Sequence, residues 1–172
     1  RVLHAGIVGA LEALAPEPVG EQVEPLAHHA MRAELWHKAV TYCQQAGARA
    51  HERAAFREAL VYFKQALQAL EHLPEPGDTR GGALELHLAL VYPLINLGEY
   101  GRGLAQLDEA EALARALDDR ARLGRVLAGM ANVRRITGDP TGAIVADRQT
   151  LALAASLGDS ALQEAASLSL GM

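Results

Sequence analysis

Histidines are the residues of this sequence whose type and spacing first suggest chemistry. Three of the seven, His28, His29 and His37, lie close together in the chain, and imidazole nitrogen is a common zinc ligand. Zinc sites usually add cysteine or carboxylate ligands from converging elements, however, and adjacent residues of a helix point about 100° apart. We therefore expect no metal site, and we expect one of His28 and His29 to be a packed, hydrogen-bonded residue.

No motif in the sequence predicts catalysis. Cys43 lies on the apolar face of an expected helix, which favours a buried thiol over a redox or catalytic one. The sequence has no glycine-rich phosphate loop followed by Lys and Ser or Thr, no Gly-x-Ser-x-Gly elbow, and no dinucleotide-binding glycine spacing. We expect no enzyme and no cofactor, and we interpret Trp36 as a packing residue at a hairpin turn.

Polar and aromatic residues at helical spacing predict a binding face on two expected helices. The candidates are Glu85, Leu88, Tyr92 and Asn96 on the first helix, and Arg125, Asn132 and Arg135 on the second. A groove with Tyr92 beside two arginines would accept an extended peptide, an acidic segment or a polyol-like ligand. The alternative is that these side chains form an ordinary solvated face.

Composition and charge exclude several classes of partner. The net charge is −5 and no basic stripe is present, so we expect no direct nucleic-acid binding. No apolar run reaches the length that a bilayer requires and no signal peptide is recognisable, so we expect no membrane partner and a cytoplasmic protein. Because the sequence starts at Arg1 and stops at Met172 inside an expected helix, we interpret it as a piece of a longer protein.

Proline and glycine divide the chain into about nine expected helices, with no strand signal. The expected ranges are 2–14, 21–33, 35–53, 56–73, 80–97, 100–116, 120–137, 140–157 and 160 to the end. A Pro-rich link is expected at 15–18 and the longest loop at 74–78. Pro93 lies inside an expected helix and predicts a bend that opens the groove beside Tyr92.

Capping residues mark several helix starts. Asp119, Asp139 and Asp159 each precede an expected helix, and Asp139 is followed by a proline suited to the first helical position. Ser160 and Gln163 have the spacing of a capping box.

A pattern of helical hairpins recurs along the chain. A small residue precedes an aromatic by two positions, and further small residues follow three and ten positions after the aromatic. The copies are Ala54, Phe56, Ala59 and Ala66; Gly98, Tyr100, Gly103 and Ala110; and Gly138, Pro140, Ala143 and Thr150. The second and third copies are 40 residues apart, and the first and second 44. A fixed period of this size predicts an all-α fold, a solenoid of antiparallel helix pairs.

These residues resemble the tetratricopeptide repeat family, in which small residues lie where paired helices cross. Gly47 and Phe63 fit the family pattern, whereas Pro140 replaces an aromatic and Asp147 stands where a large apolar residue is usual. The resemblance implies a right-handed α-solenoid with repeats at about 34–73, 80–117 and 120–157, and an incomplete repeat at 159–172. The family's carboxylate clamp is not reproduced, which disfavours a chaperone-binding role. The clamp positions hold Gln44, Ala48, Ala89, Arg125 and Gly129.

The first part of the chain resembles a narrower group. The segments 1–4, 10–12 and 26–30, with Trp36 and Tyr42, are similar to the junction that follows the ATPase region of bacterial STAND-type regulators. Such proteins combine a nucleotide cyclase or a LuxR-type DNA-binding domain with an ATPase and a helical array. This resemblance implies that residues 1–33 are junction helices and that the parent is a bacterial signalling protein.

Two classes of function remain open. The first is a non-catalytic scaffold that binds other domains of its parent chain, a peptide or a partner protein and so transmits a signal. The second is a sensor that binds a small ligand inside the concavity of the array; an open concavity with a polar rim favours the scaffold, and an enclosed aromatic one favours the sensor. We also expect self-association through the last helix, because it carries apolar residues that continue the repeat. They are Ala161, Leu162, Ala165, Ala166, Leu168 and Leu170.

Overall fold

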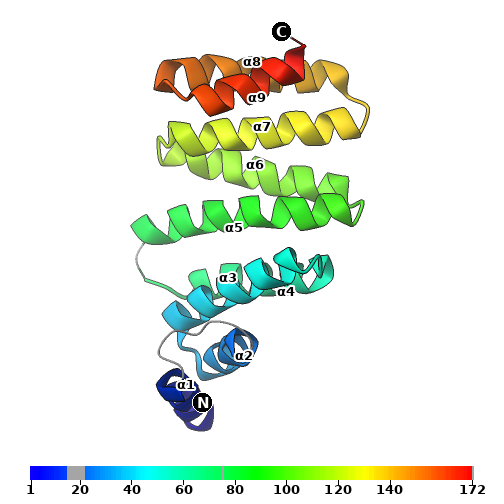
Figure 1. Cartoon of the computed structure of the whole chain (residues 1–172). Helices are drawn as coiled ribbons and strands as arrows, with labels where there is room; N and C mark the ends of the chain where they lie inside the picture. The colour runs from blue at the N-terminus through cyan, green and yellow to red at the C-terminus, as the bar shows by residue number, and fades with distance from the viewer. Residues whose placement is uncertain (15–21, 75, 172) are drawn as a thin grey trace. The chain divides into compact units, whose positions relative to one another are not determined.

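The structure is a computed structural model that describes residues 1–14, 22–74 and 76–171, without the side chains of 76–78 and 165. All regular structure in these ranges is α-helical and forms nine helices (Figure 1). In chain order they are α1 (Val2–Leu14), α2 (Val23–Ala33), α3 (Trp36–Glu52), α4 (Phe56–Leu70), α5 (Pro76–Asn96), α6 (Tyr100–Ala116), α7 (Arg120–Ile136), α8 (Pro140–Leu157) and α9 (Ser160–Leu170). The all-α fold predicted from the repeat is confirmed.

One helix start differs from the prediction made from the sequence. α5 begins at Pro76, four residues before the expected Arg80, so the expected loop at 74–78 is wrong over its last three residues. Proline favours a first helical position because its missing N–H would have had no partner there, and its fixed φ suits the helix. The Pro-rich link expected at 15–18 lies outside the described residues.

In three successive helix pairs, a residue in the turn after the first helix has a left-handed backbone conformation. The three residues lie at equivalent repeat positions. Ala54, Gly98 and Gly138 have φ values of 57°, 74° and 80°. Glycine adopts this region without a steric cost, whereas alanine does so at about 1–2 kcal/mol. The repeat seen in the sequence therefore corresponds to a repeated backbone turn.

Three aspartates cap helices in the second half of the chain. Asp119, Asp139 and Asp159 accept hydrogen bonds from the backbone N–H three residues later, at 2.9, 2.8 and 3.0 Å. These caps were predicted. The capping box led by Ser160 is wrong, because Asp159 takes the cap position and Ser160 is the first residue of α9.

The chain divides into two compact units, residues 1–86 and 87–172, with the division inside α5. In the first unit α1 packs on α2, α2 on α3 and α3 on α4. Small residues make close approach possible, and a Cβ built on Gly47 of α3 would lie only 2.5 Å from the Phe63 ring of α4. Ala59 and Ala66 are fully buried in α4, as the repeat predicts.

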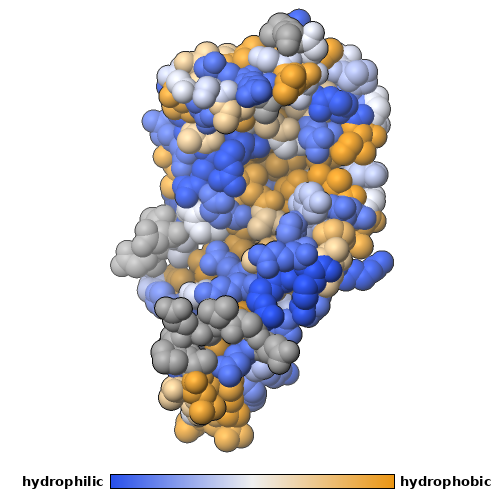
Figure 2. All heavy atoms as spheres, in the orientation of Figure 1, coloured by the Kyte–Doolittle hydropathy of each residue, from blue (hydrophilic) through white to orange (hydrophobic). Residues whose placement is uncertain are grey.

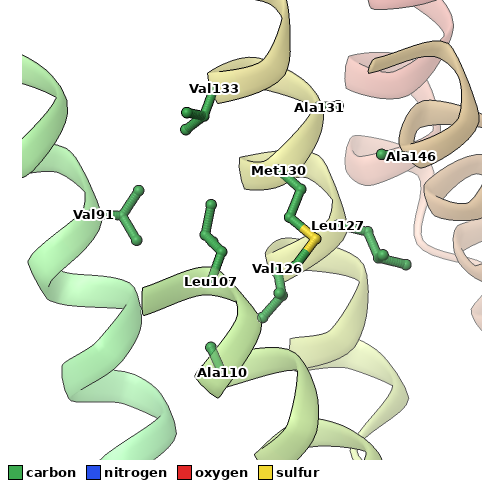
Figure 3. Packing of buried hydrophobic residues seen from close by; sticks show 9 residues of the cluster. All are labelled: Val91, Leu107, Ala110, Val126, Leu127, Met130, Ala131, Val133 and Ala146. Carbon is green, nitrogen blue, oxygen red and sulfur yellow. The ribbon is translucent and has the colours of Figure 1, made fainter. Parts of the chain in front are cut away.

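In the second unit α6 packs on α7, α7 on α8, and α9 on both α8 and α7. Its core contains Val91, Leu107, Val126 and Met130, with Leu107 projecting from α6 between α5 and α7 (Figure 3). Packing each helix on its sequence neighbours is the arrangement of an α-solenoid. None of the helices in the described ranges combines the length and the apolar character needed to cross a bilayer.

Pro93 lies in the interior of α5, as predicted, and its ring is fully buried. Because proline has no N–H, the carbonyl of Ala89 loses its usual helical partner. The helix nevertheless continues to Asn96, and the Leu97 N–H donates to the Pro93 carbonyl at 3.1 Å. The bend expected at Pro93 stays a prediction.

Candidate binding groove

A groove of about 280 Å³ lies on the second unit, between residues of α5, α6 and α7. α5 contributes four residues from one face, since they recur at intervals of three and four. The full lining is Leu88, Val91, Tyr92, Ile95, Leu107, Arg125, Gly129 and Asn132. Four of the seven residues predicted as a binding face therefore lie together: Leu88, Tyr92, Arg125 and Asn132.

The floor of the groove is apolar. Val91 and Leu107 belong to the buried core, and Leu88 and Ile95 are half-buried against it. Gly129 keeps the floor accessible, because a Cβ at this position would lie 2.9 Å from Cδ2 of Leu107. On the face shown in Figure 2, hydrophobic side chains gather over the α5 to α7 part of this unit.

The rim of the groove is polar and aromatic. Arg125 and Asn132 are exposed on α7, seven residues apart and hence on the same side of that helix. Tyr92 is 55% exposed on α5. A large aromatic ring held this far in solvent beside apolar residues can bury additional surface when a ligand binds.

A hydrogen bond joins α5 and α6 beside the groove. Nδ1 of His87 on α5 lies 2.9 Å from Oε1 of Gln106 on α6. Because an amide oxygen only accepts, His87 must carry its proton on Nδ1 for this bond to form. The bond fixes the register of the two helices next to Leu88.

The other three predicted residues have different surroundings. Glu85 belongs to the first unit and is half-buried. Asn96 donates its side-chain amide to the backbone carbonyl of Tyr92 at 2.9 Å, so it stabilises the end of α5. Arg135 does not line the groove with Tyr92 and Arg125.

Arg135 instead forms an ion pair with Asp147 of α8 at 2.6 Å. The Asp147 side chain is 4% exposed and the Arg135 side chain 41%. Forty residues earlier, at the equivalent repeat positions, Leu107 belongs to the apolar core and Ile95 packs against it. The third repeat has thus replaced an apolar pair by an ion pair, and the polar residue at position 147 has a structural partner.

The histidines near the start of the chain form a cluster. Nδ1 of His4 on α1 lies 2.7 Å from Nδ1 of His29 on α2, and the His28 and His29 rings meet edge to face at 5.1 Å. His29 is thus the packed, hydrogen-bonded member of the pair, as predicted, while His28 is exposed. Burial, then the nearby charge of His29, lowers the pKa of His4 from its ordinary 6.5. Within the described residues no group of three or more His, Cys, Asp and Glu side chains is arranged to hold a metal ion.

Cys43 is buried, as predicted, and burial raises the pKa of its thiol to about 12. Its Sγ donates to Oε1 of Gln65 at 3.8 Å. A thiol with such a pKa is almost entirely protonated near neutral pH, so it is a poor nucleophile.

Sequence reasoning missed four residues of the groove, Val91, Ile95, Leu107 and Gly129. Leu107 is a buried core residue whose Cδ2 lies where a side chain at position 129 would be, 2.9 Å from a Cβ built on Gly129. The signal available in the sequence was a glycine in the middle of a helix, where it costs about 1 kcal/mol relative to alanine and usually has a packing reason.

Comparison with known proteins assigns the chain to no family. No protein-family model matches it, and no curated protein matches its sequence.

Proposed function

We propose that this chain is a non-catalytic interaction scaffold of the tetratricopeptide type, working as part of a larger bacterial regulatory protein. The observation that carries the proposal is the groove of the second unit, which combines an apolar floor with exposed Tyr92, Arg125 and Asn132. Its volume of about 280 Å³ lies just below the range usual for small-molecule sites. A groove of this kind suits a segment of another protein better than an enclosed small ligand.

The chemistry of the groove defines the segment that it would bind. Leu88, Val91 and Ile95 offer a place for one apolar anchor side chain, which the ring of Tyr92 would cover. Arg125 lies on the opposite wall and would face an acidic residue close to that anchor. Asn132 has both a donor and an acceptor, and so would bind the peptide backbone. The ligand is therefore an extended peptide with an apolar anchor and a neighbouring Asp or Glu.

Binding of an array of immobilised peptides tests this function. The array varies the anchor among Leu, Phe and Ala and the neighbouring residue among Asp, Asn and Lys. We expect binding to require both a large anchor and the acidic residue, and Tyr92→Ala to weaken it about tenfold or more, as expected for an aromatic at the centre of an interface. Arg125→Gln should remove the preference for Asp over Asn.

Matched variants separate groove binding from a general effect of charge. Arg148 is exposed on α8 and does not line the groove, so Arg148→Gln should leave the preference for Asp unchanged. Equal loss of binding in the Arg125 and Arg148 variants, or binding that ignores the anchor, would rule the groove out as the peptide site.

A further inference from the structure

A second and larger cavity, of about 440 Å³, lies in the first unit between α2, α3 and α4. α2 contributes His28, Met31 and Arg32, which share one face because they are three and four residues apart. Glu34, in the turn after α2, and Trp36, at the start of α3, continue the wall. Gln65 and Gln68 complete it from α4. The volume lies within the range of small-molecule sites.

Among the described residues, Arg32 is the one arginine or lysine in the wall that could bind an anion. Glu34, the one acidic residue in the lining, already forms an ion pair with Arg1. Arg32 is exposed in the last turn of α2, one turn from exposed His28. The planar guanidinium of arginine binds phosphate oxygens through two parallel hydrogen bonds. Arg32 therefore gives the cavity a site suited to a phosphate group.

The remaining lining suits a flat heterocycle. His72 stacks on one side of the Trp36 indole, with ring centres 4.1 Å apart and planes at 18°, so a ligand in the cavity meets the rest of the indole. Met31 adds a polarisable apolar contact. The two glutamines offer side-chain amides, the group that pairs with both N6 and N7 of adenine.

Gln65 is held in place by the core. Its Oε1 accepts from the buried Cys43 thiol at 3.8 Å, so its amide nitrogen is the group that would donate to a ligand. Gln68 lies one turn further along α4 and is exposed. The same wall thus carries one positioned amide and one adaptable amide.

We propose that this cavity binds a purine nucleoside monophosphate, with the phosphate on Arg32, the base beside Trp36 and the base edge on Gln65 and Gln68. A nucleotide would contact Arg32, Trp36 and the two glutamine amides together. Inorganic phosphate would contact only Arg32, and a nucleoside only Trp36 and the glutamines. This site lies in the first unit and does not depend on peptide binding by the groove of the second.

The fluorescence of Trp36 tests the proposal, because Trp36 is the only tryptophan in the chain. The 172-residue chain is titrated with AMP, adenosine, ribose 5-phosphate and inorganic phosphate, with excitation at about 295 nm to avoid absorption by the base. We expect a saturable change with AMP below about 1 mM, and affinities for the other three that are at least about tenfold weaker. Saturation by inorganic phosphate at the AMP concentration, or no saturation by AMP, would overturn the site.

Two charge variants provide the sharper comparison. Arg32→Gln should weaken AMP binding about tenfold or more, because it removes a charge-assisted hydrogen bond, and should change adenosine binding less than about twofold. Lys64→Gln, an exposed position on α4 outside the cavity lining, should change neither. Unchanged AMP affinity in Arg32→Gln, with both variants melting like the original chain, would show that the phosphate does not bind as proposed.

Discussion

Glycine at position 47 is required by the size of its neighbour in the paired helix. The Phe63 ring occupies the space that a side chain at position 47 would need, and Phe63 is itself buried. Since the atoms in conflict belong to a packed ring, they cannot move aside cheaply. The small residue in α3 and the large residue in α4 are therefore one structural unit.

Gly47→Ala should lower the free energy of unfolding by about 1–3 kcal/mol, the usual cost of overpacking, despite the higher helix propensity of alanine. Gly9→Ala is the control, because Gly9 lies inside α1 with no atom within 4 Å of an added Cβ. That variant should be neutral or more stable by up to about 1 kcal/mol. Urea denaturation measures both, and equal stability of the two variants would contradict the packing argument.

The ion pair of Arg135 and Asp147 leads to a different prediction from the one that sequence alone suggests. An arginine on a binding face could be replaced without loss of stability. Here Arg135→Ile leaves the carboxylate of Asp147 buried without its partner, and we expect a loss of about 1–3 kcal/mol, below the usual range for fully buried pairs because Arg135 is partly exposed.

Adding Asp147→Leu to Arg135→Ile should recover most of that loss, because the double variant copies Ile95 and Leu107 of the preceding repeat. A thermodynamic cycle from urea denaturation measures the coupling between the two positions. A double variant no more stable than Arg135→Ile alone would show that the apolar pair does not fit the third repeat.

At the scale of the helix, sequence signals of short range were the most reliable. Prolines and glycines between helices, aspartate caps and the small residues of the repeat act within one helix or one hairpin, and together they predicted most helix bounds to within three residues. The start of α5 failed because a Pro-Gly segment reads as a loop although its proline suits a helix start.

Contacts between helices distant in sequence were less predictable. His4 and His29 are 25 residues apart, and no local spacing indicates that their rings meet. The cavity around Arg32 likewise combines side chains from three helices. Helical spacing identified four of the groove residues on α5 and α7, and it grouped Arg135 with them, whereas Arg135 pairs with Asp147 of α8. Spacing indicates the side of a helix on which a residue lies, but not which neighbouring helix packs there.

The histidine cluster predicts that the packing of α1 depends on pH. The hydrogen bond between His4 and His29 needs one of the facing nitrogens to be unprotonated. His28 and Arg32 add positive charge nearby, and the pKa of His4 in the folded protein is lower than its ordinary 6.5. The folded state therefore binds fewer protons than the unfolded state. The stability that the hydrogen bond between His4 and His29 contributes is complete above about pH 6.5 and is lost as the pH falls below it.

Thermal unfolding measured between pH 7.5 and 5 should show a falling melting temperature, and His4→Asn should reduce that fall. The Glu12 carboxylate, whose pKa is lowered by hydrogen bonds from Lys38 and Tyr42, loses its contribution only below about pH 4.5 and does not affect this window. His37, exposed on α3, provides the control variant His37→Asn. If the melting temperature fell equally with pH in the His4 variant and the original chain, the histidine cluster would not be the cause of the fall.

At the scale of the whole chain, α9 presents one face inward and another to solvent. Leu162 lies close to Gly124 of α7, where an added Cβ would be 2.5 Å from it, and Ala166 is buried. Leu168, on the other side of α9, is 71% exposed. Only some of the apolar residues that continue the repeat in α9 thus pack against α7 and α8.

We predict that the chain self-associates weakly through this outer face of α9. Burial of exposed apolar surface favours association, but stable interfaces bury at least about 1,200 Å², which one leucine and its small neighbours do not provide. Sedimentation velocity over a range of concentrations should therefore show a rising sedimentation coefficient without a stable dimer. Leu168→Gln should suppress the rise, whereas Val61→Gln, which changes another exposed apolar residue, on α4, should not. A monomer at every concentration, or equal suppression by the two variants, would show that the exposed leucine of α9 does not mediate association.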